Sequence, residues 1–125
     1  MNLYDNFDKS GLDGVDNQKA WDKLPNLLKY FINSTQKMIV DKVYKKVEKK
    51  YGKSGVESLV KTSGFRSYNT NKRVNGVVDS LHLYGCAVDF AKVGIFKNES
   101  IPVCCELECI DCGRCWHIQL KRGEN

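Results

Sequence analysis

Two histidines are the only ones in this chain, and the residues around them could together bind a metal. His82 lies in a polar stretch, and Asp89 follows it by seven residues inside a short apolar run. His117 lies near the C-terminal end, directly after Trp116. Two imidazoles and one carboxylate, with a fourth position left for water, are typical of a catalytic zinc site, whereas structural zinc sites are usually closed by four protein ligands. The residues alone leave a plainer interpretation open, in which two unconnected histidines and a strand-end aspartate share no site.

The sequence around Asp89 and His117 predicts two half-buried strands. Apolar residues alternate with other residues over 86–90 and over 116–120, which places one face of each strand on a core and the other face outwards. Asp89 and His117 both fall on the outward faces. If the two strands are antiparallel neighbours, their Cβ atoms could lie as close as ~5 Å. His82 would precede the first strand by a turn that Gly85 makes easy.

Helical patterns dominate the first half of the chain. Apolar residues recur at helical spacing over residues 34–51, which predicts a helix with Ser34 or Thr35 as its N-cap and Gly52 at its end. An earlier helix is predicted over 17–32, and Pro25 either breaks it or starts its second half.

Shorter elements are predicted between the helices and the two strands. Residues 58–62 indicate a short strand, and residues 68–74 a short helix that stops at the turn signal Asn75-Gly76. Because helices come first and strands follow, the order favours an α+β fold over a parallel βαβ arrangement.

Length and composition limit the number of domains, the location and the possible partners of the protein. A chain of 125 residues predicts a single domain over 1–125, and its composition is ordinary for a globular protein. We expect no membrane span and no secretory signal, and therefore synthesis in the cytoplasm. A net charge of +5 suits an acidic partner such as nucleic acid or an anionic wall polymer. The lysines gather in residues 41–53, however, and read more simply as the solvated face of a helix.

A longer pattern joins these residues. Residues 63–90 read "SGFRSYNTNKRVNGVVDSLHLYGCAVDF", and this stretch resembles the signature of the zinc D,D-peptidases. That family contains D-alanyl-D-alanine carboxypeptidases and dipeptidases and phage L-alanyl-D-glutamate endolysins. Its pattern is S-G-Y/F-R-S, an Asn, a Gly-containing turn, and then S-x-H-x-x-G-x-A-x-D. The family's closing W-H strand corresponds to Trp116-His117, and the opening residues 6–18 also resemble small phage-type members.

The resemblance implies both a fold and a set of site residues. The fold would be hedgehog/D,D-peptidase-like, a small antiparallel sheet packed against N-terminal helices. Zinc would be bound by His82, Asp89 and His117, would activate a water and would polarise the scissile carbonyl. Arg66 would steady the substrate carbonyl or the developing oxyanion, with a structural ion pair as the alternative. Ser80 would support the site, by touching the substrate or by holding the loop.

The chain departs from the family pattern at the general base. Many members carry an acid three residues before the last histidine, and Arg114 stands there in this chain. Arginine cannot act as a base because it does not lose its proton in proteins. The nearest acids are Glu106, Glu108 and Asp111. Because some phage-type relatives carry an acid followed by Gly further upstream, the favoured prediction is that Asp111 is the catalytic base.

A cysteine cluster near the C-terminus has no counterpart in the resemblance. Its spacing leaves open a second metal site, disulfides formed after export, or free thiols. The first two possibilities concern Cys105, Cys109, Cys112 and Cys115. Cys115 also shares its strand parity with His117, whereas Cys86 would face the core.

Three functions follow as hypotheses. The first is a monomeric zinc peptidase that cuts peptidoglycan stem peptides, either as a D-Ala-D-Ala carboxypeptidase or as an L-Ala-D-Glu endopeptidase. A phage-type enzyme of this kind would reach the wall through a holin. We expect it to have no nucleic-acid partner. The second is a relative that keeps the metal but has lost the base, and acts as a wall-binding or phage structural module. The third is a Cys-rich metal- or nucleic-acid-binding protein, which gives no reason for the spacing of Arg66, His82 and Asp89.

Overall fold

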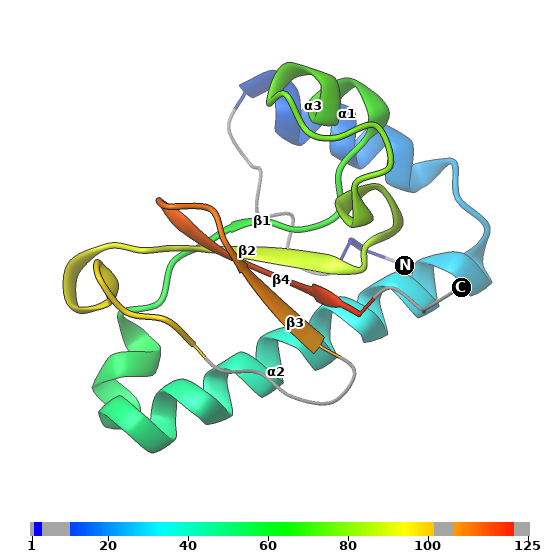
Figure 1. The fold of residues 1–125 in the computed structure, drawn as a ribbon. Helices are drawn as coiled ribbons and strands as arrows, with labels where there is room; N and C mark the ends of the chain where they lie inside the picture. Colours follow the sequence, from blue (N-terminus) through cyan, green and yellow to red (C-terminus); the bar gives the residue numbers. More distant parts are fainter. Residues whose placement is uncertain (1, 4–10, 102–106, 122–125) are drawn as a thin grey trace.

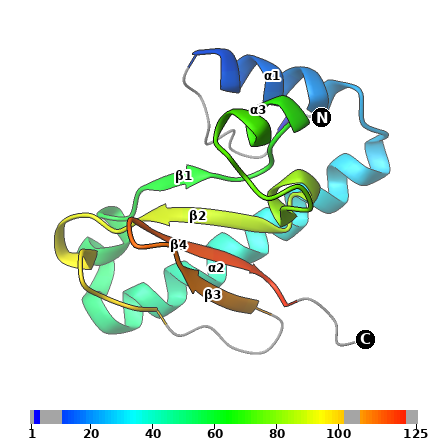
Figure 2. The same cartoon turned by 45° about the horizontal axis from the view of Figure 1, so that its top comes forward.

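A four-stranded antiparallel sheet lies against one long helix, α2 (Asn26–Glu57), in the computed structural model. The model describes residues 2–3, 11–101 and 107–121. The sheet contains β1 (Lys61–Ser63), β2 (Ala87–Ala91), β3 (Leu107–Asp111) and β4 (Cys115–Leu120), in the spatial order β1-β2-β4-β3. Helices α1 (Gly11–Asp22) and α3 (Tyr68–Arg73) lie side by side on the β1 side of the sheet (Figure 1 and Figure 2). The α+β prediction is therefore confirmed.

The main core lies between α2 and one face of the sheet. The predicted stripe of α2 supplies Ile39, Val43 and Val47, all buried, and Trp116 and Ile118 of β4 pack against it. A second, smaller cluster joins Trp21 of α1, Ile32 of α2 and Phe65. Among the described residues, no helix has the length and apolar character needed to cross a membrane.

The helix boundaries differ from the sequence prediction. α1 ends at Asp22, and Pro25 is the N-cap residue of α2, so the second half of the predicted earlier helix continues straight into the predicted later one. Neither Ser34 nor Thr35 is an N-cap. Thr35 is buried inside the helix, where its hydroxyl donates to the Phe31 carbonyl at 2.9 Å. A threonine can satisfy its hydroxyl in either setting, so residue type alone did not distinguish them.

Smaller corrections concern the ends of α2 and β1. Gly52, the predicted stop, has φ 76° and marks a kink from which the helix continues to Glu57. The first strand covers Lys61–Ser63 instead of 58–62. The predicted helix over 68–74 is confirmed as α3, and β3 was not predicted.

Candidate metal centre

Two central strands bring Asp89 and His117 together. β2 and β4 pair antiparallel, and Asp89 lies directly opposite His117 in their register. Their neighbours Val88, Trp116 and Ile118 point into the core against α2. Because side chains alternate along a strand, Asp89 and His117 lie on the other face. The predicted strand pairing is thus confirmed.

His82 comes from a 3-10 turn, η1 (Leu81–Tyr84), just before β2. The Ser80 side chain caps this turn by accepting a hydrogen bond from the His82 backbone N–H at 3.2 Å. Gly85 ends the turn with φ 67°, and a Cβ there would lie 2.3 Å from Ile32 Cγ2. Glycine is therefore required both by the left-handed backbone and by the close approach of α2. His82 is 1% exposed.

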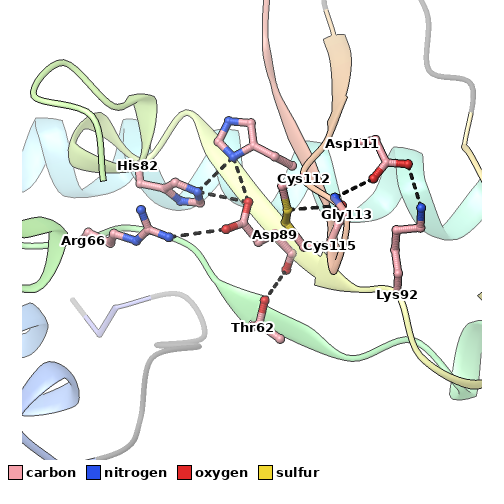
Figure 3. Close-up of a disulfide and its surroundings, with 10 residues drawn as sticks. Thr62, Arg66, His82, Asp89, Lys92, Asp111, Cys112, Gly113 and Cys115 are labelled. Atoms are coloured by element: carbon pink, nitrogen blue, oxygen red, sulfur yellow. Dashed lines mark hydrogen bonds and ion pairs between the residues drawn. A yellow bond between two sulfur atoms is a disulfide. The ribbon is translucent and has the colours of Figure 1, made fainter. Parts of the chain in front are cut away.

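The three side chains converge on a small volume. Asp89 Oδ1 lies 3.1 Å from His82 Nε2 and 2.8 Å from His117 Nδ1, and the two nitrogens are 3.2 Å apart. Figure 3 shows His82 and Arg66 both pointing toward Asp89. One ligand atom from each of His82, Asp89 and His117 lies within 4.8 Å of the other two, and within the described ranges this is the only such group that could hold a metal ion.

The ring nitrogens of His82 and His117 that point away from Asp89 form hydrogen bonds that indicate whether a cation fits between the two rings and Asp89. His82 Nδ1 lies 2.8 Å from the Gly64 carbonyl, and His117 Nε2 lies 2.7 Å from Gln119 Oε1. Both partners are acceptors, so in the neutral rings these outer nitrogens carry the protons. The inner nitrogens then offer lone pairs, and they face each other and a carboxylate oxygen. Three acceptors gathered in this way require a proton or a cation between them, and two imidazoles with a carboxylate are a zinc donor set.

Charge coupling within the group shifts its pKa values. Burial alone would raise the pKa of Asp89, but the hydrogen bonds with His117 and His82 lower it well below its usual range. Burial alone would lower the pKa of His117, but its contact with Asp89 raises it above the ordinary value. Without a metal, the pair thus favours a carboxylate beside an imidazolium.

Arg66 lies beside the group and is tied down at three points. Its Nε donates to Ser63 Oγ at 2.9 Å, and its two terminal nitrogens approach Asn71 Oδ1 at 3.4 Å and Asp89 Oδ2 at 3.3 Å. The side chain is 12% exposed and lines a cavity of about 420 Å³ together with the three metal-binding candidates. An arginine has five N–H donors, and the contacts with described residues use three of them. The ion pair with Asp89, which was the alternative role, is present, and these contacts leave two N–H donors for the predicted role toward a substrate.

The residues between Arg66 and His82 form a tight support for the arginine. Ser67 is the N-cap of α3 and accepts from the Thr70 N–H at 3.0 Å, as expected of a local cap. The Asn71 side-chain amide donates to the Val77 carbonyl at 2.9 Å. A Cβ at Gly76 would lie only 2.0 Å from Asn71 Oδ1. Gly76 is thus needed so that Asn71 can hold both the turn and Arg66.

Asp111 does not lie with the metal-binding candidates. It is the cross-strand partner of Trp116, which is a core residue, whereas Ile110 is the partner of His117. The Asp111 carboxylate accepts from Lys92 Nζ at 2.6 Å and from the Gly113 N–H at 2.8 Å, and the Lys92 contact lowers its pKa (Figure 3). This position argues against the sequence-based assignment of Asp111 as the base, because alternation along β3 turns the carboxylate away from the site.

The cysteines fall into three groups. Cys112 and Cys115 form a disulfide that closes the β3–β4 hairpin, and both line the cavity beside His117 (Figure 3). Cys86 and Cys109 are free, half-buried thiols, and burial raises the pKa of both. Cys104 and Cys105 lie outside the described residues, as does Glu106. Cys109, Cys112 and Cys115 belong to no metal-binding group among the residues that are described.

Two further residues lie near the site, of which Gln119 was not predicted from the sequence and Glu108 was named only as one of the nearest acids. Gln119 is buried, and its amide contacts both His117 and Glu108. The alternation over 116–120 did place Gln119 on the same face as His117, which was the available signal. Glu108 could not be placed, because the register of β3 is not visible in the sequence.

Comparison with known proteins agrees with this geometry. The family model described as Peptidase M15 matches residues 8–119, which include every element that contributes to the site. No curated protein and no solved structure matches the chain significantly. Since the match covers most of the chain, including Arg66, His82, Asp89 and His117, the chain belongs to the peptidase M15 family, the zinc D,D-peptidases.

Proposed function

We propose that this protein is a zinc-dependent peptidase that hydrolyses peptidoglycan stem peptides, at either the D-Ala-D-Ala or the L-Ala-D-Glu bond. The observation that carries the proposal is the convergence of one possible ligand atom each from His82, Asp89 and His117 beside a cavity. Family membership supports the substrate class and the choice of zinc.

The residues of the site have separable tasks in this proposal. His82, Asp89 and His117 hold the zinc, which when bound supplies a water of lowered pKa and a Lewis acid. Arg66 directs its two remaining N–H donors into the cavity, where they hydrogen-bond the substrate carbonyl as negative charge develops on its oxygen. Ser80 keeps the η1 turn in place through the His82 backbone and thereby orients the His82 ring.

The reaction also needs a group that accepts the proton of the water and returns it to the leaving amine. Among the described residues that line the cavity, Asp89 is the one carboxylate, and it is committed to the metal. Asp111 would have to leave Lys92 and cross the strand to take part. We therefore expect Asp111→Asn to retain most hydrolysis, and Glu106→Gln and Glu108→Gln to be the informative variants. Loss of ~10²–10⁴ in rate with zinc still bound would identify the base.

The test of the proposal is digestion of purified peptidoglycan. The zinc-loaded protein should release free amino groups, and the mass of the products should show which bond is cut. A chelator should stop the reaction, and His82→Ala should lose both one equivalent of zinc and the activity. Unchanged zinc content in His82→Ala would rule out the site.

A second function is favoured by one specific observation. Arg114 replaces the usual acid, and among the described residues no second carboxylate lines the cavity. A protein with this site could bind a stem peptide at its zinc without cutting it, as a wall-binding or phage structural module. Binding of a stem peptide by the zinc-loaded parent, with no product after prolonged incubation, would establish this function instead of the peptidase. If the protein is a phage enzyme, its route to the wall would be a holin.

A further inference from the structure

A line of three hydrogen-bonded side chains crosses from β3 to the metal centre. Glu108 and Gln119 are direct cross-strand partners, and Gln119 Nε2 donates to Glu108 Oε1 at 2.6 Å. Gln119 Oε1 in turn lies 2.7 Å from His117 Nε2. His117 Nδ1, on the other side of the ring, faces Asp89 and His82. The proposed function gives Gln119 no task and considers Glu108 only as a candidate general base.

The order of donors and acceptors along this line is fixed by Glu108. A carboxylate offers only acceptors, so Glu108 requires the NH₂ group of Gln119 to point toward it. The amide oxygen of Gln119 must then point toward His117. An oxygen can only accept, so His117 Nε2 must carry a proton. In the metal-free protein Nδ1 shares a second proton with the Asp89 carboxylate, and a bound metal would replace that proton.

Without Glu108, the orientation of the Gln119 amide would no longer be fixed. An amide can turn by half a rotation and exchange its oxygen and nitrogen at almost no cost in shape. A turned Gln119 would present N–H to His117 Nε2, and the ring proton would then move to Nδ1. That proton would then be the only one on the ring, and it could not leave for a metal without forming an imidazolate. Glu108 and Gln119 are thus both needed to keep His117 Nδ1 available to a metal.

We propose that Glu108 and Gln119 are positioning residues that keep a proton on His117 Nε2, so that Nδ1 can give up its proton to a metal, and that this arrangement sets the metal affinity of the site. The inference rests on the proposed function only for the identity of the metal. Gln119 is 6% exposed, so little water is present to replace either hydrogen bond. Outer hydrogen bonds of this kind typically change metal affinity by ~10–100-fold when they are lost.

The experiment compares four variants with the parent. Gln119→Leu and Glu108→Leu each break the line, and both should weaken zinc binding, by ~10–100-fold for Gln119→Leu. The exchange variant Glu108→Gln/Gln119→Glu keeps its direction, because Gln at 108 can donate to Glu at 119, which accepts from His117 Nε2. It should recover the parent affinity. Glu57→Leu is the matched control, because Glu57 is exposed at the end of α2 and should leave the affinity unchanged.

A second readout separates positioning from packing and does not need zinc. Long-range ¹⁵N correlation spectra of the metal-free protein report whether each nitrogen of His117 holds a proton. Nδ1 faces the Asp89 carboxylate in all of these proteins, so Nε2 is the informative nitrogen. The parent and the exchange variant should show Nε2–H, and Glu108→Leu should show its loss. Unchanged affinity and unchanged tautomer in both Leu variants would overturn the inference, and so would weakened binding with Nε2–H retained throughout. If the parent bound no zinc, the proposed function would fail, while the spectra would still decide the tautomer.

Discussion

Arg66 and the metal both compensate the charge of Asp89, so they should contribute to different properties of the protein. Arg66→Ala should keep zinc bound, because the three ligands remain, but it should lose most hydrolysis, because the oxygen of the substrate loses its donors. It should also destabilise the metal-free protein more than the zinc-loaded one, because a nearly buried Asp89 charge is then left without either partner.

Zinc content, peptide hydrolysis and thermal midpoints with and without zinc would check this prediction. Arg73→Ala is the matched control, since Arg73 forms its ion pairs with Asp13 and Asp16 on α1. Equal hydrolysis by Arg66→Ala and the parent would contradict the assigned role.

The coupling of Asp89 and His117 predicts how the metal-free protein responds to pH. The pKa of Asp89 is lowered on folding, so its contribution to stability is present above its unfolded pKa and is lost as pH falls through the folded value. The pKa of His117 is raised, so its contribution is present below its unfolded pKa and is lost as pH rises through the folded value. Together they stabilise the fold most between about pH 4 and pH 6.5. The thermal midpoint of the parent, compared with that of His117→Ala, should show an advantage near pH 5.5 that shrinks as the pH is raised. An advantage that grows with rising pH would contradict the coupling.

The positions of the three candidate ligands could be predicted from the sequence because each has a local signal, whereas their proposed role as ligands came from the family resemblance. Alternation over 86–90 and 116–120 fixed the faces of Asp89 and His117, and Gly85 indicated the turn that positions His82. The position of Asp111 could not be predicted in the same way. The face of the sheet on which its side chain lies depends on the register of β3 against β4, and no local pattern in a five-residue strand sets that register.

At the scale of elements, the turn after α3 depends on Gly76. A Cβ at this position would meet Asn71 Oδ1 and push the amide away from Arg66 and from the Val77 carbonyl. Gly76→Ala should therefore cost about 1–3 kcal/mol of unfolding free energy. In an Asn71→Ala background the obstacle is gone, so the same change should cost much less. Denaturant unfolding of the four proteins of this cycle would measure the coupling, and simple additivity would contradict the clash.

The β3–β4 hairpin is closed by the disulfide between Cys112 and Cys115. Such a short loop has little entropy to lose, so the bond should contribute no more than about 2 kcal/mol. The double variant Cys112→Ser/Cys115→Ser should lower the unfolding free energy by up to that amount and still bind zinc, because five residue pairs join β2 and β4. A phosphine reductant should lower the midpoint of the parent and leave that of the double variant unchanged. Loss of zinc from the double variant would show that the hairpin depends on the bond.

The long helix shows where local signals fail at this scale. Thr35 and Gln36 are polar residues in the middle of α2, and both are buried. Gln36 accepts a hydrogen bond from the Phe65 N–H, so its place is set by a segment 29 residues away. Sequence patterns predicted the apolar stripe of α2 but could not distinguish a polar residue that serves a distant loop from one that starts a helix.

Considered as a whole, the molecule places its core and its site on opposite faces of one sheet. Val88, Trp116 and Ile118 hold β2 and β4 against α2, and the same strands present Asp89 and His117 on the other side. The small cluster of Trp21, Ile32 and Phe65 attaches the segment around Arg66 to the helices. The match to the peptidase M15 family model spans both parts.

The separation of the ligands along the chain has a consequence for the time course of folding. Asp89 and His117 are 28 residues apart, and His82 and His117 are 35 apart. Contacts over such distances form late, because closing the intervening chain costs entropy before any contact compensates for it. Zinc would then find its ligands assembled only after the main barrier is crossed. It should slow unfolding by a large factor and leave the refolding rate nearly unchanged. Stopped-flow measurements with and without zinc would check this, and refolding accelerated by zinc would instead mean that the ligands gather before the barrier.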